Sequence, residues 1–132
     1  MLCEGHGIIL ALFLTAGQRH ESRYFEALMA RVMRPGRAKR WPKRLAGDRG
    51  YSYPHIRRWL RKRRIEDVIP TRKDQPRIKR FKKATYRKRN LIERVVGWYK
   101  ECRHLGTRYD KLAVNYLAFW LIACIERVLR LG

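Results

Sequence analysis

The sequence has few acidic residues for its number of basic ones. Its 132 residues include 33 Lys and Arg but only 11 Asp and Glu, which gives a net charge of +22. This imbalance predicts a polyanionic partner, and nucleic acid fits it better than an anionic membrane surface. Because 45% of the residues are hydrophobic, the chain is not a disordered basic tail.

Cysteine is also scarce. The three cysteines, Cys3, Cys102 and Cys124, form no closely spaced pair, and their number is odd. This argues against a disulfide framework and favours a reducing, cytoplasmic environment. The four histidines show no ligand spacing with the cysteines, so a zinc site is not expected either.

Long hydrophobic runs are missing as well. The two most apolar stretches, residues 8–14 and 112–125, are shorter than the roughly 20 residues that span a bilayer. We therefore predict no membrane span and expect both stretches to be buried in a core.

The basic residues are concentrated in the middle of the chain. Residues 34–89 contain 23 basic and four acidic side chains, a net charge of +19. Residues 1–33 contain three of each kind, and residues 90–132 contain seven basic and four acidic, a net of +3. The middle is therefore predicted to meet the polyanion, and the two ends to supply the folding core.

Hydrophobic periodicity predicts an α/β protein with one domain over residues 1–132. Strands are predicted at residues 8–15, 44–47 and 65–69, and helices at residues 21–33, 53–64, 86–105 and 110–131, with Asp110 capping the last. This alternation favours a layered sheet with some parallel pairing. Residues 71–84 have no apolar periodicity and are predicted to form a basic loop.

One face of the predicted helix over residues 86–105 carries an unusual set of side chains. At about 100° per residue, these lie within about 60° of one another: Tyr86, Arg89, Glu93 and Lys100. The opposite face is apolar and includes Leu91, Val95, Trp98 and Cys102. An ordinary amphipathic helix with a solvated charged side would also explain this pattern.

The spacing Tyr-x2-Arg-x3-Glu-x6-Lys resembles the C-terminal signature of insertion-sequence transposases of the DDE class. In that family the glutamate is the third metal-binding carboxylate, and the other three side chains contact DNA. The resemblance therefore implies metal binding by Glu93, and DNA binding by Tyr86, Arg89 and Lys100.

Two further segments resemble the same family. The block Leu-Ala-Gly-Asp-Arg-Gly-Tyr around Asp48 is similar to its second-aspartate motif, which implies a metal ligand at Asp48 and a DNA contact at Arg49. An aspartate that only caps a turn beside Gly50 is the alternative. The segment Leu-Cys-Glu-Gly-His-Gly resembles the first-aspartate motif, with Glu4 in place of aspartate.

The resemblance implies a ribonuclease H-like fold, a mixed sheet flanked by helices that brings the acids together. Glu4, Asp48 and Glu93 would hold Mg²⁺ or Mn²⁺ ions, which stabilise charge on the attacking and leaving oxygens of phosphoryl transfer. The implied function is DNA strand cleavage and transfer. The implied partner is double-stranded DNA, both transposon ends and target, in the bacterial cytoplasm at the nucleoid, and a homo-oligomer on DNA is compatible with it.

Two departures leave enzymatic activity open. Glu4 is one methylene longer than aspartate, and only residues 1–3 remain of the first, central strand of such a sheet. The separate N-terminal DNA-binding region that such transposases usually carry is not expected here either, so we expect a truncated or inactive copy of a transposase catalytic domain. A non-catalytic basic nucleic-acid-binding protein is the main alternative. A membrane-surface protein, suggested by the amphipathic helix at residues 53–64, is a further one.

Overall fold

A computed structural model describes residues 1–15, 21–32, 41–79, 81–102, 105 and 112–131. The chain divides into two compact units. The hairpin unit consists of Met1–Leu14 and Asn90–Gly132, and the basic unit consists of Thr15–Arg89. By sequence, the hairpin unit has seven basic and five acidic residues (+2), whereas the basic unit has 26 and six (+20).

The hairpin unit begins with a short antiparallel pair. β1 (Leu2–Cys3) pairs with β2 (Ile9–Ala11). In the turn between them, the Gly7 N–H donates to the Glu4 carbonyl over 3.1 Å. Gly7 has a φ of 88°, a left-handed conformation that glycine adopts without the steric cost of a side chain.

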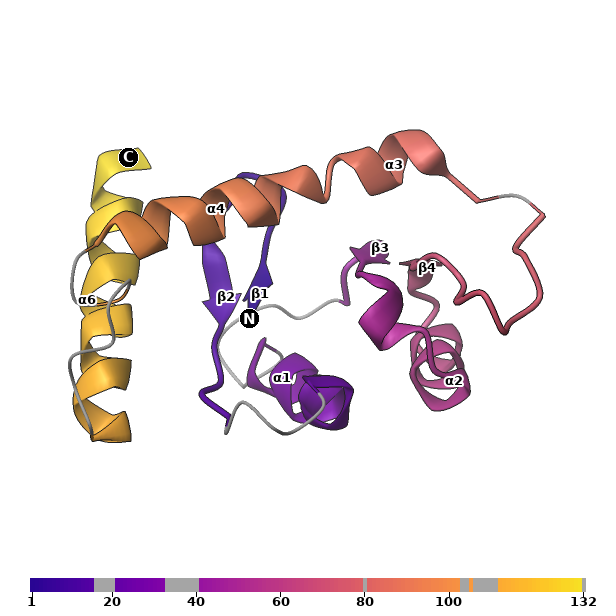
Figure 1. Cartoon of the computed structure of the whole chain (residues 1–132), viewed down its shortest axis with the longest axis horizontal. Helices are drawn as coiled ribbons and strands as arrows, with labels where there is room; N and C mark the ends of the chain where they lie inside the picture. The colour runs from indigo at the N-terminus through magenta and orange to yellow at the C-terminus, as the bar shows by residue number, and fades with distance from the viewer. Residues whose placement is uncertain (16–20, 33–40, 80, 103–104, 106–111, 132) are drawn as a thin grey trace. The chain divides into compact units, whose positions relative to one another are not determined.

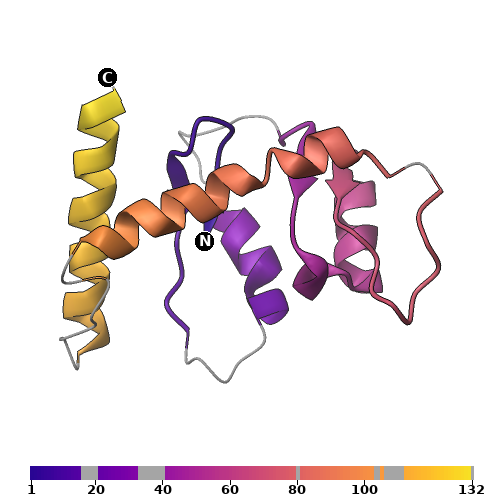
Figure 2. The same ribbon diagram turned by 45° about the horizontal axis from the view of Figure 1, so that its top comes forward.

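The described residues of the hairpin unit also form two helices. α4 (Asn90–Glu101) runs across α6 (Ala113–Leu131), and the hairpin lies against α4 in both views (Figures 1 and 2). The approach is close at Gly7, where an added Cβ would lie 2.8 Å from Val95 Cγ2. The Arg127 guanidinium of α6 also donates to the Gly7 carbonyl over 3.2 Å.

The core of the hairpin unit is aromatic. Tyr99 is 1% exposed, and its ring centroid lies 5.1 Å from that of Trp120 and 4.9 Å from that of Trp98. Burial, together with a hydrogen bond with Cys124, raises the pKa of Tyr99 well above its ordinary value. The core cluster includes the side chains predicted to face inward: Leu91, Val95, Trp98 and Cys102.

The basic unit alternates short helices and strands. Its elements are η1 (Glu21–Tyr24), α1 (Phe25–Val32), β3 (Arg44–Ala46), η2 (Arg49–Tyr51), α2 (Pro54–Lys62), β4 (Glu66–Val68) and α3 (Lys83–Arg87). β3 and β4 pair in parallel, with Leu45 opposite Asp67. Pro54 occupies the first turn of α2, where its missing N–H has no helical partner to lose.

Apolar faces of α1 and α2 form the core of the basic unit. Phe25 of α1 meets Trp59 of α2 edge to face, with ring centroids 5.3 Å apart. Ile56 and Leu60 are fully buried, as the periodicity of α2 predicts. The predicted inward face of α1 is buried too, at Phe25, Leu28, Met29 and Val32.

The prediction of an α/β protein with parallel pairing is confirmed, but the single mixed sheet is wrong for the described residues. They form two separate two-stranded sheets, β1–β2 and β3–β4. The strands are also shorter than predicted; residues 8–15, for instance, contribute only Ile9–Ala11. A strand this short buries little of the sequence around it, so the helices supply most of the core.

Two predicted helices need correction. The helix predicted from residue 86 to 105 is interrupted, because Lys88 and Arg89 form a turn between α3 and α4. The final helix is present, but the expected burial of residues 112–125 is wrong for several large side chains: Leu112, Val114, Leu121, Ile122 and Ile125 are 53–77% exposed. One face of α6 packs on α4 and leaves its other faces outside the core. The predicted cap, Asp110, lies outside the described residues.

The described helices include none with the length and apolar character that a bilayer crossing requires.

Candidate nucleic-acid interface

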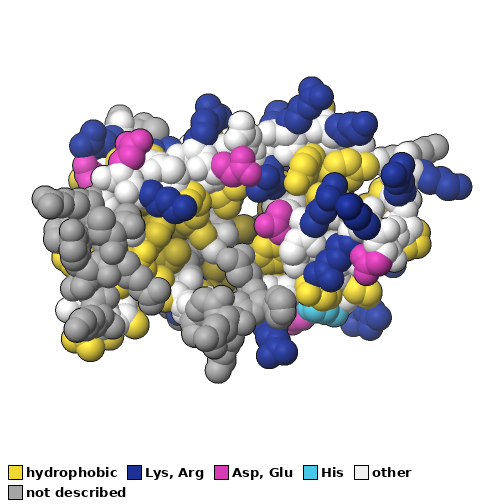
Figure 3. Space-filling view, in the orientation of Figure 1, with side chains coloured by type: hydrophobic (Ala, Val, Ile, Leu, Met, Phe, Trp, Pro, Cys, Tyr) yellow, Lys and Arg dark blue, Asp and Glu magenta, His cyan; other side chains and the backbone are white. Residues whose placement is uncertain are grey.

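The basic unit contains a cavity of about 1110 Å³ beside η2 and the loop that follows β4. Its lining is strongly cationic: it includes Arg49, Arg72, Lys73, Arg77, Lys83 and Arg87, and among the described residues its one carboxylate is Asp48. Lys and Arg side chains gather over this part of the molecule, around α2 and α3 (Figure 3). The cavity therefore combines a wall of positive charge with a single acid.

Asp48 lies at the N-terminus of η2 and caps it. Its Oδ1 accepts a hydrogen bond from the Gly50 N–H over 2.7 Å. A Cβ at position 50 would lie only 2.8 Å from this oxygen, so a larger residue there would have to displace the carboxylate. The carboxylate is exposed, and no hydrogen bond within the described part of the chain uses Oδ2. The turn-cap alternative and a ligand role are thus compatible, because each needs a different oxygen.

Arg72 is held at the edge of the cavity by two contacts. Its Nε donates to the Arg49 carbonyl over 3.3 Å, and its guanidinium carbon lies 4.1 Å from the centroid of the Tyr53 ring. Hydrogen bonding from Arg72 lowers the pKa of the Tyr53 phenol. The cation is therefore fixed beside the residue that follows Asp48.

An aromatic pair forms another part of the cavity wall. Phe81 and Tyr86 have ring centroids 5.4 Å apart, and both line the cavity. The Arg89 guanidinium lies 5.4 Å from the Tyr86 ring centroid. The structure thus brings Tyr86 and Arg89 together, although they lie in α3 and the turn after it rather than in the helix of Glu93.

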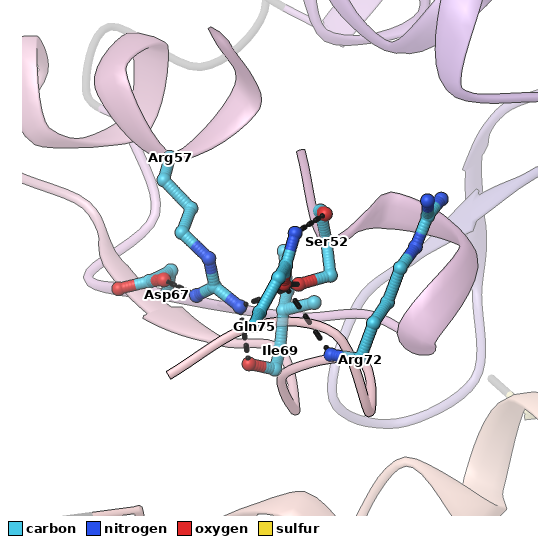
Figure 4. A network of polar contacts seen from close by, with 6 residues as sticks. All are labelled: Ser52, Arg57, Asp67, Ile69, Arg72 and Gln75. Atoms are coloured by element: carbon cyan, nitrogen blue, oxygen red, sulfur yellow. Dashed lines mark hydrogen bonds and ion pairs between the residues drawn. The ribbon is translucent and has the colours of Figure 1, made fainter. Parts of the chain in front are cut away.

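A polar network underlies the loop that supplies half of these cations (Figure 4). Arg57 of α2 forms an ion pair with Asp67 of β4 and donates to the Ile69 carbonyl over 2.9 Å. The same guanidinium donates to the Ser52 hydroxyl over 2.9 Å. The Arg57 side chain is 18% exposed and that of Asp67 34%, so the ion pair is partly shielded from water. The network ties together the segments on which the cavity is built.

Glu4 lies in the hairpin turn and serves the turn itself. Its Oε1 accepts from the backbone N–H groups of His6 (2.7 Å) and Ile8 (3.0 Å), and its Oε2 contacts His6 Nδ1 at 2.8 Å. Partial burial acts to raise the pKa of Glu4, but these hydrogen bonds lower it by more. Both carboxylate oxygens are therefore engaged.

Glu93 and Lys100 are exposed residues of α4, in its first and last turns. The side chains of Leu91 and Val95 are those that approach Gly7 in the hairpin turn. Each is two residues from Glu93, or about 200° around the helix, so Glu93 lies on the other side of α4. The structure does not bring Glu93 and the Glu4 turn together.

The predicted residues thus fall into two groups. Asp48, Arg49 and Tyr86 share the cavity of the basic unit, with Arg89 beside Tyr86. Glu4, Glu93 and Lys100 belong to the hairpin unit. Within the described ranges, no three His, Cys, Asp or Glu side chains lie close enough to hold a metal ion.

Sequence reasoning missed the cavity residues between β4 and α3. In the sequence, nothing distinguishes Arg72, Lys73 and Arg77 from the other residues of a basic loop without periodicity. Their placement depends on Gln75, whose partner Ser52 is 23 residues away, and no local pattern signals a contact at that separation. The excess of positive charge over residues 34–89 was the one available signal.

Comparison with known proteins gives one match. A family model described as the transposase DDE domain matches residues 1–125. No curated protein and no solved structure matches the chain.

Proposed function

Because this chain belongs to the transposase DDE domain family, we propose that it acts in DNA transposition and that the cavity of the basic unit contacts the backbone of double-stranded DNA. The meeting of Asp48, Arg49 and Tyr86 in this cavity carries the proposal. The family resemblance assigns one of them to the metal and two to DNA, and they come from segments more than 35 residues apart.

Charge supports the same role. DNA binding releases counterions for each phosphate that a Lys or Arg neutralises, so affinity depends steeply on salt. Six cations of the described residues line one cavity, in a unit with a net charge of +20. Arg49 and Arg72 provide guanidinium groups for phosphate oxygens, and Tyr86 provides a ring for stacking or a hydroxyl for hydrogen bonding. Arg89 and Lys100 are proposed as additional DNA contacts.

For the chemistry, we propose that Glu4, Asp48 and Glu93 ligate Mg²⁺ or Mn²⁺ when DNA is bound, in a ribonuclease H-like arrangement. Carboxylate oxygens are the hard ligands that these ions prefer, and the ions stabilise charge on the attacking and leaving oxygens. Asp48 fits this role through Oδ2. To bind a metal ion, Glu4 would have to give up the hydrogen bonds of its turn. The hairpin turn would also have to move relative to α4, because the turn packs on the face of α4 opposite to Glu93.

The DNA assignment is tested by two charge-matched variants of one loop. Arg72→Met removes a cation that lines the cavity, whereas Lys79→Met removes an exposed cation of the same loop outside the lining. We expect Arg72→Met to reduce the slope of log affinity against log salt by about one, and Lys79→Met to leave it near the parental value. Equal effects would contradict a DNA site in the cavity.

The metal assignment is tested by DNA cleavage with Mg²⁺ or Mn²⁺. Asp48→Asn and Glu93→Gln should each abolish cleavage while salt-dependent DNA binding persists, because these substitutions keep side-chain size and remove the charged ligand. Cleavage that survives both substitutions would show the acid assignment to be wrong. A parent chain that binds DNA steeply with salt but cuts none would favour a non-catalytic nucleic-acid-binding protein.

A further inference from the structure

Gln75 is the residue that attaches the basic loop to the rest of the basic unit. Its Oε1 accepts from the Ser52 hydroxyl over 2.6 Å and from the Arg72 N–H over 3.3 Å. Its Nε2 donates to the Ser52 carbonyl over 2.9 Å. One side chain thus fixes both the fold of its own loop and the distance of that loop from Ser52 (Figure 4).

Ser52 is itself held in place. Its side chain is fully buried, and its hydroxyl accepts from Arg57 while donating to Gln75. A hydroxyl has one donor, so accepting from the guanidinium leaves that donor for Gln75 and sets the orientation of the amide. Since Arg57 is paired with Asp67, the position of Gln75 is set from β4 through α2.

This chain of contacts ends beside Asp48. Ser52 is the C-cap residue of η2, and Asp48 is its N-cap residue. In the loop, Gln75 accepts a hydrogen bond from the backbone N–H of Arg72. The Arg72 guanidinium in turn donates to the carbonyl of Arg49, which lies in η2. The network therefore attaches the cation of the loop to the same short helix that Asp48 caps, and both residues line the cavity.

We propose that Gln75 is a positioning residue for DNA binding: it holds Arg72 at the cavity beside Asp48, so that a phosphate can meet the cation next to the acid. The inference rests on the proposed function, because it assigns a role to Gln75 only if the cavity contacts DNA. The ordering occurs before DNA arrives, which reduces the entropy that binding must otherwise remove from the loop.

The test is a double-mutant cycle between Gln75→Met and Arg72→Met, with DNA affinity measured over a range of salt concentrations. Methionine matches the length of glutamine but makes none of its hydrogen bonds. We expect Gln75→Met alone to reduce the salt slope by about one and the affinity several-fold, as Arg72→Met does. In the Arg72→Met background, Gln75→Met should have little further effect on the slope, because the cation that it positions is already gone.

A second variant approaches the contact from the other side. Ser52→Ala removes the hydroxyl between Arg57 and Gln75 but keeps the Ser52 carbonyl that accepts from Gln75, so it should reduce the slope in the same direction but by less, and this loss should again be absent in the Arg72→Met background. Additive effects of Gln75→Met and Arg72→Met on the slope would overturn the proposal, as would a Gln75→Met protein that melts earlier but retains the full slope. If Arg72→Met behaves like Lys79→Met, the proposed DNA site fails. If only Arg72→Met reduces the slope, the positioning role fails and the DNA site stands.

Discussion

The two units of this chain differ in charge and in what holds them together. The hairpin unit carries a net charge of +2 and is organised around Tyr99, which is 1% exposed among aromatic neighbours. The basic unit carries +20 and has, besides its apolar core, a chain of polar contacts from Asp67 through Arg57 and Ser52 to Gln75. Dense positive charge thus coincides with a specific polar framework.

The difference has a physical reason. Like charges repel, and a cationic loop cannot bury enough apolar surface to order itself. Hydrogen bonds from buried residues beneath the loop, such as Ser52, can hold it in place and leave its cations exposed. A unit of nearly balanced charge has no such need, and packing alone can order it. The following three predictions test this contrast, beginning with the largest effect.

Replacing Gly7 by alanine should destabilise the hairpin unit severely. A Cβ there would adopt a φ of 88° and lie 2.8 Å from Val95 Cγ2, and strain and overpacking together cost about 2–5 kcal/mol. Denaturant unfolding should reveal this loss. Gly5→Ala is the matched control, since a Cβ at Gly5 has nothing within 4 Å. Equal stability of the two variants would contradict the packing described for the turn. Because the cavity belongs to the basic unit, the salt slope of DNA binding should not change in either folded variant.

Removing the guanidinium of Arg57 should weaken the basic unit. Arg57→Met breaks the ion pair with Asp67 and removes the donor to the buried Ile69 carbonyl, which we expect to cost about 2–3 kcal/mol in denaturant unfolding. Arg44→Met provides a control with the same change of charge. Its pair with Glu66 is solvent-exposed, so its loss should cost less than about 1 kcal/mol. A smaller cost for Arg57→Met than for Arg44→Met would show that the network does not support the unit.

The smallest expected effect is on the acid unfolding of the hairpin unit, through the Glu4 carboxylate in its turn. The pKa of Glu4 is lowered in the folded chain, so the unfolded chain takes up its proton at higher pH. The stabilisation by this carboxylate is therefore complete above its ordinary pKa of 4.5 and is lost as the pH falls through the lowered value. Glu4→Gln should cost at most about 1 kcal/mol at neutral pH and make acid unfolding less steep. Glu101→Gln, at an exposed carboxylate that ends α4, should leave the acid transition closer to that of the parent. An unchanged transition in Glu4→Gln would contradict the role of the turn.

Much of the secondary structure was predictable because it depends on local spacing. The i, i+3, i+4, i+7 pattern of α1 marked its buried face, and Pro54 marked the first turn of α2. The inward residues of α4, Val95 and Trp98 among them, were also read correctly from periodicity. The turn at Lys88 and Arg89 was not predicted, since both residues are compatible with a continuous helix.

The candidate site was predictable only in part. Spacing against a known signature pointed to Asp48, Arg49 and Tyr86, which the structure places in one cavity. The exposure of Leu121 and Ile125 was missed, because an apolar sequence records a tendency to be buried and not whether a partner is present. Gln75 was missed because its hydrogen bonds join residues far apart in the chain.

The sequence by itself determined the α/β character of this protein and the charge of its middle, since these follow from composition and from short-range spacing. Its membership of the transposase DDE domain family comes from the match of residues 1–125 to the family model. Only the tertiary structure decided which cations line the cavity with Asp48, that the strands of the described residues form two small sheets, and that Glu4 is bound to its own turn. Those outcomes depend on contacts between distant segments, where hydrogen-bond geometry and packing select one arrangement among many that the same local pattern allows.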